Sequence, residues 1–268
     1  MEQTWQVTAI KYADRNTRTR QDSFILDDDH ASPHAMDYFL WVLQSDLGTI
    51  LVDTGYDTAE GARRGRPVLR DPDVALRAVG VDPDAIETVI ITHMHYDHAG
   101  GLDRFPNAVF HIQEAEMQYV TGPCMCHPHL RYPFSAEHVC QMIRTLYDGR
   151  VRFHDQEGNI APGVTVHRIG GHTKGLQVVR VRTSAGWMVL ASDASHYYEN
   201  YLKGKPFPIV VDLQEMLDGF QTVQRLASSP SLVVPGHDPQ VFDLFAATEG
   251  LPDFARRLDL GPVRSVDA

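Results

Sequence analysis

The chain has 268 residues, 43% of them hydrophobic, so it is long enough to bury a full core, and nothing in its composition indicates disorder. Its 35 acidic side chains outnumber the 24 basic ones and give a formal net charge of -11. Such a surface repels phosphate backbones and anionic lipid headgroups, so nucleic acid and membranes are excluded as expected partners.

The start of the chain predicts strands. Residues 1–20 lack the continuous apolar run of a secretory signal, and no later run reaches the length of a membrane span. β-Branched and aromatic residues predict strands at 5–12 and 38–43, followed by a turn at 46–48 and a further strand at 49–52. We expect these strands to form an antiparallel meander.

The pattern then changes to alternating helices and strands. Residues 73–79 are helix-like, and the short β-branched run 87–92 ends abruptly in a polar cluster, which is typical of a strand that delivers side chains to a loop. We expect a helix to start after His98, a strand at 108–112 and a second helix at 113–120.

Residues 121–149 are irregular and rich in His, Pro, Tyr and Arg before a helical stretch at 136–146. We interpret this segment as an insertion or lid within a single domain that spans residues 1–268.

The same segment holds all three cysteines, Cys124, Cys126 and Cys140. This odd, crowded set argues against a disulfide framework and fits a reducing cytoplasm. A zinc site that combines the first two thiolates with His127 and His129 is an alternative. One residue between thiolates is short for a structural zinc site, however, and no second pair follows.

The remainder of the chain repeats the opening theme. Strands are expected at 164–169, 176–183 and 187–192, a helix at 213–227 and a last strand at 232–234. Two similar halves, each running from strands into helices, predict an α/β fold with two sheets packed face to face and helices outside.

The densest chemical signal is the run from His93 to His98, which reads His-Met-His-Tyr-Asp-His. Alternate side chains on an extended turn point to one side, so His93 and His95 aim together, while the following turn brings Asp97 and His98 towards a neighbouring position. The cluster therefore suits two metal ions better than one. A surface loop that is rich in histidine by chance is the alternative, but only 14 of the 268 residues are histidine.

Three further candidate ligands also follow predicted strands, namely His172 after Gly171, Asp193 after Ser192, and His237 after Gly236. Taken singly, such a histidine is more often a core or surface residue than a ligand. Three of them at strand ends, beside the first cluster, favour a shared metal site.

With these landmarks the chain resembles the metallo-β-lactamase superfamily, whose hallmark His-x-His-x-Asp-His is complete here. An Asp in the run Leu51-Val52-Asp53-Thr54-Gly55 and the three strand-end residues also match, in order, so the resemblance covers roughly residues 38 to 240. It implies the four-layered αβ/βα sandwich, in agreement with the two halves.

The resemblance also implies a ligand set. The first metal would be held by His93, His95 and His172, the second by Asp97, His98 and His237, with Asp193 bridging them. Asp53 is expected to orient a metal-bound imidazole, with capping of the turn at Gly55 as the alternative; Thr92 and Thr173 are candidates for similar support. Zinc is the expected ion, and iron, manganese or cobalt suit the same ligands.

This set predicts hydrolysis. Two divalent ions about 3.5 to 4 Å apart can share a hydroxide and polarise a carbonyl oxygen. We expect that hydroxide to attack an acyl carbon, with the first metal stabilising the oxyanion and the second receiving the leaving group. Asp97 would orient the nucleophile and take up its proton.

Within the superfamily, residues 92–101 and 191–195 are most similar to the lactonases that open acyl-homoserine lactones and related rings. Those lactonases usually carry a tyrosine three positions after the bridging aspartate, where this chain has His196. An imidazole can donate a hydrogen bond or act as general acid, so His196 is a candidate catalytic residue. The alternatives are that Tyr197 takes the role, that the substrate differs, or that His196 packs against the insertion.

Pocket walls are expected from the loop at 27–36 and from residues 121–134. Apolar surface for a ring or acyl chain would come from four side chains, Met36, Tyr132, Phe134 and Phe207. The arginine series comprises Arg63, Arg64, Arg66 and Arg70, and it either attracts a carboxylate-bearing substrate or forms an ordinary solvated loop.

A dinuclear-metal lactonase acting on a small-molecule lactone or ester is therefore the leading hypothesis. A thioesterase of the glyoxalase II type, or another ester or amide hydrolase, shares the metal cradle and differs only in pocket walls. A non-catalytic sensor module is the third hypothesis. The intact ligand set argues against it. A homodimer is expected because relatives are often dimers.

Overall fold

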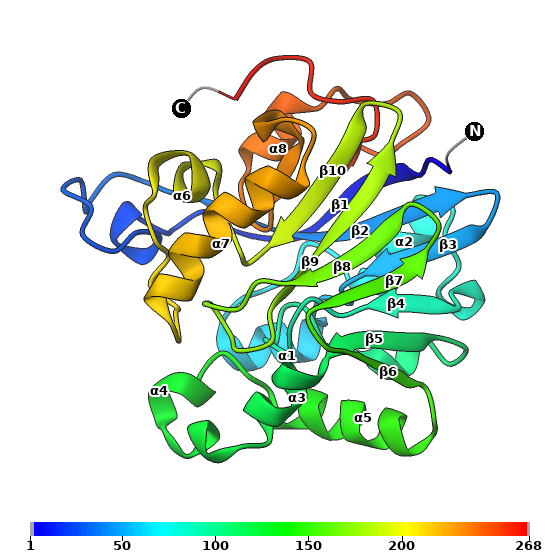
Figure 1. The fold of residues 1–268 in the computed structure, drawn as a ribbon, viewed down its shortest axis with the longest axis horizontal. Coiled ribbons are helices and arrows are strands. Elements are labelled where there is room, and N and C mark those ends of the chain that lie inside the picture. The colour runs from blue at the N-terminus through cyan, green and yellow to red at the C-terminus, as the bar shows by residue number, and fades with distance from the viewer. Residues whose placement is uncertain (1–2, 267–268) are drawn as a thin grey trace.

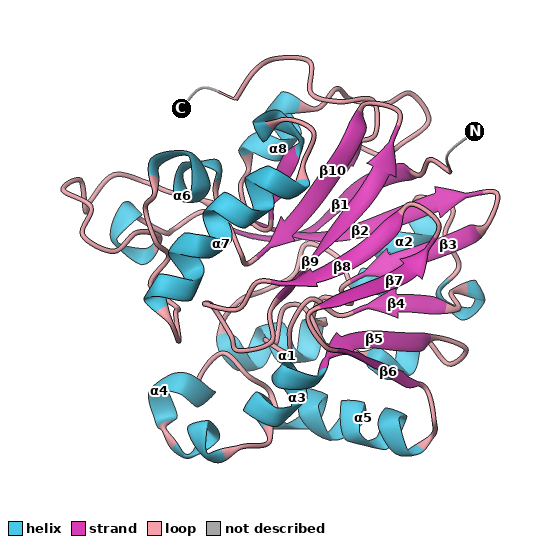
Figure 2. Ribbon diagram, in the orientation of Figure 1, coloured by secondary structure: helices cyan, strands magenta, loops and turns pink. Residues whose placement is uncertain are grey.

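Two β-sheets lie face to face at the centre of the computed structural model, which describes residues 3–266. Helices flank the pair of sheets on its outer sides (Figure 1, Figure 2). This is the α/β sandwich that the two-halves pattern predicts.

The larger sheet has seven strands in the order β12-β1-β2-β3-β4-β5-β6. Strands β1, β2 and β3 pair antiparallel, which confirms the predicted meander, whereas β3 to β6 run parallel. The bounds are β1 (Gln6–Arg15), β2 (Met36–Ser45), β3 (Gly48–Val52), β4 (Thr88–Ile90), β5 (Val109–Gln113), β6 (Val151–His154) and β12 (Ala255–Arg257).

The smaller sheet has five strands in the order β11-β10-β9-β8-β7. Strands β7 to β10 are antiparallel neighbours, and β11 joins β10 in parallel. The bounds are β7 (Glu157–Ala161), β8 (Val164–Arg168), β9 (Gln177–Thr183), β10 (Gly186–Ser192) and β11 (Val233–Pro235).

Eight helices of the described chain surround the sheets, and among them α2 contacts β1, α3 contacts β5 and α7 contacts β10. Their bounds are α1 (Thr58–Arg64), α2 (Pro72–Ala78), α3 (Glu114–Val120), α4 (Pro128–Arg131), α5 (Ala136–Tyr147), α6 (Tyr198–Lys203), α7 (Leu213–Leu226) and α8 (Gln240–Leu244). Short 3₁₀ turns lie at Arg20–Asp22, Pro83–Ala85, Leu102–Arg104, Pro123–Cys126 and Pro230–Leu232.

Strand β2 of the larger sheet is buried on both faces. In β2 the first eight residues, Met36 to Leu43, are all buried. In β9 Arg180 and Arg182 are only half-buried, so one face of this strand is more polar than the other. Hydrophobic residues of both sheets form one core.

Several predicted elements differ from the structure. The expected helix directly after His98 is wrong, because the chain makes a turn there and the left-handed backbone of Gly101 (φ 66°) precedes a single 3₁₀ turn. The pattern also misses β6, β7, β12, α1, α6 and α8, which are short. Short elements carry too few residues to show a period.

The segment 121–149 folds into a 3₁₀ turn, α4 and α5, and it is joined to the histidine run. The backbone N–H of Tyr96 donates to the carbonyl of Pro133 at 2.9 Å, and His95 forms an isolated β-bridge with Phe134. Its three cysteines are free thiols.

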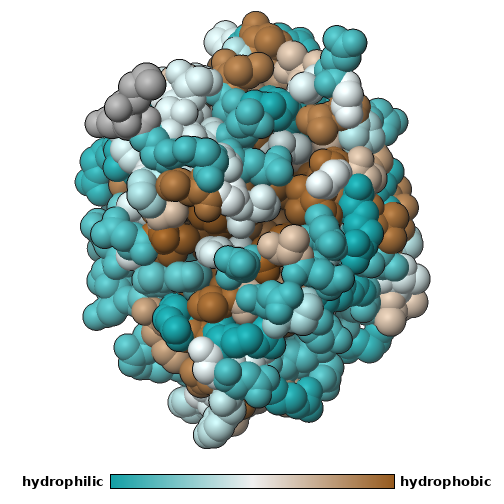
Figure 3. Space-filling view, turned by 90° about the vertical axis from the view of Figure 1, so that its right-hand side faces the viewer, coloured by the Kyte–Doolittle hydropathy of each residue, from teal (hydrophilic) through white to brown (hydrophobic). Residues whose placement is uncertain are grey.

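Figure 3 shows the side of the molecule that lies at the right of Figure 1. Hydrophilic side chains cover most of this face, and hydrophobic ones gather in a broken band across its middle. Among residues 3–266, none of the helices combines the length and the apolar character needed to cross a bilayer.

Candidate metal centre

Parallel strand pairs bring the candidate ligands to one edge of the sandwich. Asp53 directly follows β3, and the histidine run follows β4, its parallel neighbour. In the second sheet Asp193 follows β10 and His237 follows β11, again parallel neighbours. Since the carboxyl ends of parallel strands meet at the same edge, each pair is gathered by the strand order alone.

His172 reaches the same edge through a glycine turn. Strands β8 and β10 both pair antiparallel with β9, so they run in the same direction and the loop after β8 starts beside that after β10. Gly171 has a φ of 78°, and an added Cβ would lie 2.5 Å from the backbone nitrogen of Met216. Glycine therefore fits where other residues clash.

The structure brings all seven sequence-predicted ligands together. Their ligand atoms fall into three overlapping groups, in each of which all atoms lie within 4.8 Å of one another. The groups are His93, His95, His172 and Asp193; Asp97, His98 and His237; and Asp193, His196 and His237. All eight side chains are buried. The cysteine-based alternative around Cys124 is not among the candidate clusters of residues 3–266.

Asp193 lies between the first two groups, with one carboxylate oxygen towards each. Oδ2 lies 3.0 Å from His172 Nε2 and 3.6 Å from His93 Nε2. Oδ1 lies 2.9 Å from His237 Nε2 and 3.2 Å from His98 Nε2. A carboxylate placed in this way can bind one ion through each oxygen.

The donor set fits divalent cations. His93 Nε2, His98 Nε2 and Asp193 Oδ1 are buried and have no hydrogen-bond partner within the described chain, which is costly for polar atoms unless a ligand satisfies them. Burial holds the pKa of His93 and of His95 well below the ordinary value, so both imidazoles are in the neutral, metal-binding form. Burial alone would raise the pKa of Asp193, but the surrounding histidines hold it well below its usual range.

Outer hydrogen bonds fix the orientation of these rings. His98 Nδ1 lies 2.7 Å from Asp53 Oδ2. The Nδ1 of His172 donates to the carbonyl of Ile209 at 2.7 Å, and that of His237 to the carbonyl of Asp37 at 2.8 Å. Each of these rings therefore presents Nε2 to the site.

Asp53 also fastens the first turn of the site. Its carboxylate accepts hydrogen bonds from the backbone N–H of Thr92 at 2.7 Å and from the Thr92 hydroxyl at 2.8 Å. Within residues 3–266 none of its hydrogen bonds goes to Gly55, and the contact with His98 is one that an orienting residue would make. Thr92 Oγ1 further lies 2.8 Å from Ser192 Oγ, which links the loops of the two sheets.

We expect Asp53→Ala to lower metal affinity by roughly 10- to 100-fold, because His98 loses the acceptor that fixes its ring. Competition with a chromogenic chelator would measure the change. Asp53→Asn keeps an acceptor oxygen and should recover part of the affinity, and the exposed Asp28→Ala serves as control. Equal affinity of Asp53→Ala and the control would exclude the orienting role.

Sequence reasoning missed Glu116. This fully buried carboxylate on α3 accepts hydrogen bonds from the backbone N–H of Met94 (2.9 Å), the hydroxyl of Thr173 (2.7 Å) and the backbone N–H of Gly175 (3.0 Å). It thereby joins the histidine run to the loop of His172. Its sequence context, a helix with a second glutamate at Glu114, gives no signal that one of the two is buried.

His196 lies inside the cluster rather than against residues 121–149. Its Nε2 is 3.0 Å from Asp193 Oδ2, and its ring stacks on Phe207 with centroids 3.4 Å apart. Burial lowers its pKa to about 3, so the imidazole is neutral near pH 7. Tyr197 does not line the pocket; its hydroxyl accepts a hydrogen bond from Ser23 Oγ at 3.4 Å.

Three of the four expected wall residues, Met36, Tyr132 and Phe207, line the pocket above the cluster. Phe134 instead packs edge-on against the ring of His95, with centroids 4.5 Å apart. An adjoining cavity of about 230 Å³ shares His95 and Tyr132 with this pocket.

The arginine series divides into different roles. Arg63 and Arg64 form ion pairs with Glu60. Arg70 donates to the carbonyl of Lys11 and lies over the ring of Phe254, as a structural residue would. Only Arg66 of the series lines the pocket.

Comparison with known proteins agrees with this geometry. The sequence model of the Metallo-beta-lactamase superfamily matches residues 38–249. An N-acyl homoserine lactonase of a Bacillus species is 28% identical over 184 residues, which are 62% of this chain and 67% of that protein. A probable metallo-hydrolase of Mycobacterium tuberculosis is 26% identical over 233 residues, which are 76% and 75% of the two chains.

Solved structures share the fold. An N-acyl homoserine lactone hydrolase with the product N-hexanoyl-L-homoserine at its catalytic metal centre superposes with a TM-score of 0.74 at 22% identity, covering 91% of this chain and 96% of that one. The dizinc quorum-quenching lactonase AidC gives a TM-score of 0.70 at 13% identity, covering 100% and 97%. The family match, the sandwich and the gathered ligands lead to one conclusion: the chain belongs to the metallo-beta-lactamase superfamily and is a metal-dependent hydrolase.

Proposed function

We propose that this hydrolase holds two divalent ions, with zinc as the expected metal, and opens the ring of a small lactone, such as an N-acyl homoserine lactone. The observation that carries the proposal is the position of Asp193, whose two oxygens face separate sets of buried imidazoles. The lactonases among the relatives support the choice of substrate class.

The seven candidate ligands divide between two metal sites, following the first two of the three groups described above. One ion would be held by His93, His95 and His172, the other by Asp97, His98 and His237, and Asp193 would be shared. Bound in this way, the ions supply Lewis-acid activation of a carbonyl oxygen and of water.

Two side chains would handle hydrogen bonds and protons. Asp97 lines the pocket and can accept the proton of the attacking water through its carboxylate. His196 also lines the pocket, and its Nδ1 has no hydrogen-bond partner within the described chain, so a neutral ring protonated on Nδ1 can donate to the substrate carbonyl. Its stacking on Phe207 holds the ring in place.

Two hollows are available for the substrate. The pocket above the cluster would take the lactone ring against Met36 and Phe207. The adjoining cavity of about 230 Å³, lined in part by Leu130 and Ile209, would take an acyl chain. Tyr132 and Pro133 contribute to both, so we propose that the insertion 121–149 acts as a wall of the site.

A substrate panel tests the proposal. Metal-loaded protein should hydrolyse lactones faster than thioesters and β-lactams, and a chelator should abolish turnover. Rapid thioester cleavage with inert lactones would favour the glyoxalase II type of thioesterase. Tight metal binding without turnover of any panel member would favour the sensor module.

We expect His196→Phe to lower kcat by about 10²-fold, because the substrate carbonyl loses one hydrogen-bond donor, while both ions stay bound. Steady-state kinetics and elemental analysis of the same preparation measure the two effects. Tyr197→Phe is the matched control and should leave the rate close to wild type. Undiminished turnover in His196→Phe would remove this residue from the mechanism.

A further inference from the structure

Three arginines, Arg15, Arg18 and Arg66, are among the residues that line the pocket above the candidate metal ligands. They come from the end of β1, the loop after it, and the loop after α1. Only Arg66 belongs to the series that the sequence analysis singled out.

Arg18 is buried, with 7% of its surface exposed. Its Nη2 donates to Ser23 Oγ at 3.2 Å and to the backbone carbonyl of Asp22, and its Nε has no hydrogen-bond partner. Among residues 3–266 no carboxylate forms an ion pair with it. A buried cation of this kind is costly unless an anion faces it.

Arg66 is held in place by neutral groups. Its Nη1 donates to Tyr96 Oη at 2.6 Å and its Nη2 to Tyr132 Oη at 3.1 Å. Arg15 is half-buried, and within the described part of the chain its side chain forms neither a hydrogen bond nor an ion pair. Neither guanidinium has a carboxylate partner in residues 3–266.

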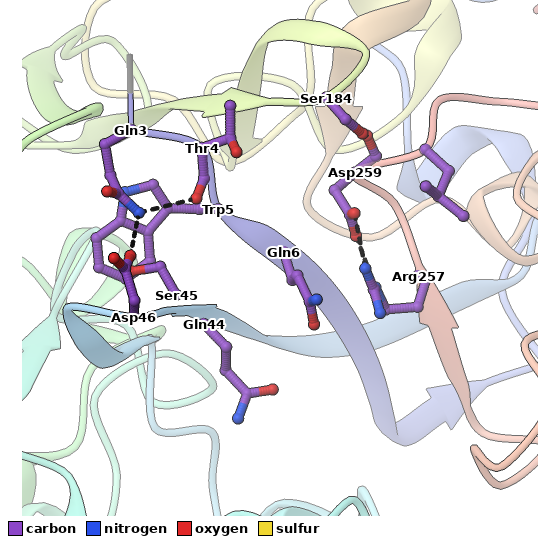
Figure 4. Close-up of a pocket in the computed structure, with 11 residues that line it drawn as sticks. Gln3, Thr4, Trp5, Gln6, Gln44, Ser45, Asp46, Ser184, Arg257 and Asp259 are labelled. Carbon is purple, nitrogen blue, oxygen red and sulfur yellow. Dashed lines mark hydrogen bonds and ion pairs between the residues drawn. The ribbon is translucent and has the colours of Figure 1, made fainter. Parts of the chain in front are cut away.

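Several arginines elsewhere in the described chain pair with carboxylates, whereas others, such as Arg70, donate to backbone carbonyls. Arg20, close to this pocket in sequence, pairs with Asp27 and Glu199. A second cavity, of about 640 Å³, lies at the other end of β2 and contains Arg257, which binds Asp259 through two contacts of 2.7 Å (Figure 4). In a chain of net charge -11, three arginines that have no carboxylate partner within residues 3–266 gather around this one pocket.

The carboxylates of the same pocket do not fill this role. Asp97 and Asp193 point at the histidines and are the candidate metal ligands. Two bound divalent cations would make the pocket more positive still. An anionic group on the substrate would complement these charges.

We propose that the substrate carries a carboxylate apart from the ester bond that is cleaved, and that Arg18 and Arg66 bind this carboxylate, with Arg15 adding to the attraction. The inference rests on the proposed lactonase function, which it refines from neutral lactones to small lactones that bear a carboxylate. Guanidinium groups suit this role because their N–H groups match the two oxygens of a carboxylate.

Two lactones of equal size test the inference, namely a γ-butyrolactone with a ring carboxylate and its carboxamide. Wild type should show a kcat/KM for the carboxylate about tenfold or more above that for the carboxamide, since one charge-assisted hydrogen bond contributes at least a factor of this order. In Arg66→Gln that ratio should fall about tenfold. Arg144→Gln removes an exposed arginine that pairs with Glu137 and should leave the ratio unchanged.

A binding measurement separates this inference from the function itself. Glutarate and its monoamide are titrated calorimetrically into metal-loaded wild type, Arg66→Gln and Arg15→Gln. These two variants avoid a substitution at the buried Arg18, which could disturb folding. Glutarate should bind about tenfold tighter in wild type, and the difference should shrink in the variants. If both lactones are inert but glutarate is still preferred, the lactonase proposal fails while the anion site stands. Equal affinity for the two ligands in wild type, or a preference unchanged in both variants, overturns the anion site.

Discussion

Asp193→Ala is expected to lower hydrolytic turnover by about 10³-fold or more and to reduce bound metal from about two ions per chain to one or none. The physical reason is that, among residues 3–266, this carboxylate is the only group with an oxygen towards each of the two imidazole sets. Its loss removes a candidate ligand from both sets. It also removes the negative charge that the two bound ions would share.

Elemental analysis and steady-state kinetics on one preparation measure both effects. Asp218→Ala, an exposed position on α7, is the matched control and should retain full metal content and rate. Circular dichroism checks that Asp193→Ala is folded. A folded variant with wild-type metal content and rate would refute the shared-ligand assignment.

Glu116→Ala is expected to lower the free energy of unfolding by roughly 3 to 5 kcal/mol, because it strips two backbone N–H groups and a hydroxyl of their buried acceptor. Metal affinity should fall as well, since the freed loops carry His93, His95 and His172. Chemical denaturation of the metal-free protein measures the first effect, and chelator competition measures the second.

Glu114→Ala offers a control on the same helix, at an exposed position whose carboxylate accepts a hydrogen bond from the side chain of Gln118. It should change stability by less than about 0.5 kcal/mol. Similar losses in the two variants would mean that the buried contacts of Glu116 contribute little.

The candidate metal ligands could be predicted because each one is a polar residue that follows an apolar strand. His172 and His237 were found in this way although they lie far from His93 in the chain, since parallel strands carry their ends to a common edge. The long strands β1, β2, β9 and β10 were predicted for a related reason, because a buried strand is an apolar run that sequence shows directly.

Other parts of the site depend on packing that sequence does not display. Arg15 and Arg18 look like surface residues of a charged N-terminal stretch, and only the fold turns them towards the pocket. The choice between His196 and Tyr197 depends on the conformation of the turn before α6. The two residues are adjacent in sequence, but their side chains point to different places, His196 to Asp193 and Tyr197 to Ser23. The role of each metal ligand stays a prediction until the ions are measured, as do the homodimer, the cytoplasmic location and the limits of the domain.

The division of the ligands between two sheets has a consequence for synthesis of the protein on the ribosome. The run from His93 to His98 follows strand β4 of the larger sheet, whereas His172, Asp193 and His237 follow strands of the smaller one. A nascent chain can therefore complete neither ligand set until strands of the second sheet have emerged, and the set with His237 only after β11 has emerged. Metal binding would thus occur late in folding. It would link the two sheets and stabilise the assembled sandwich relative to the unfolded chain.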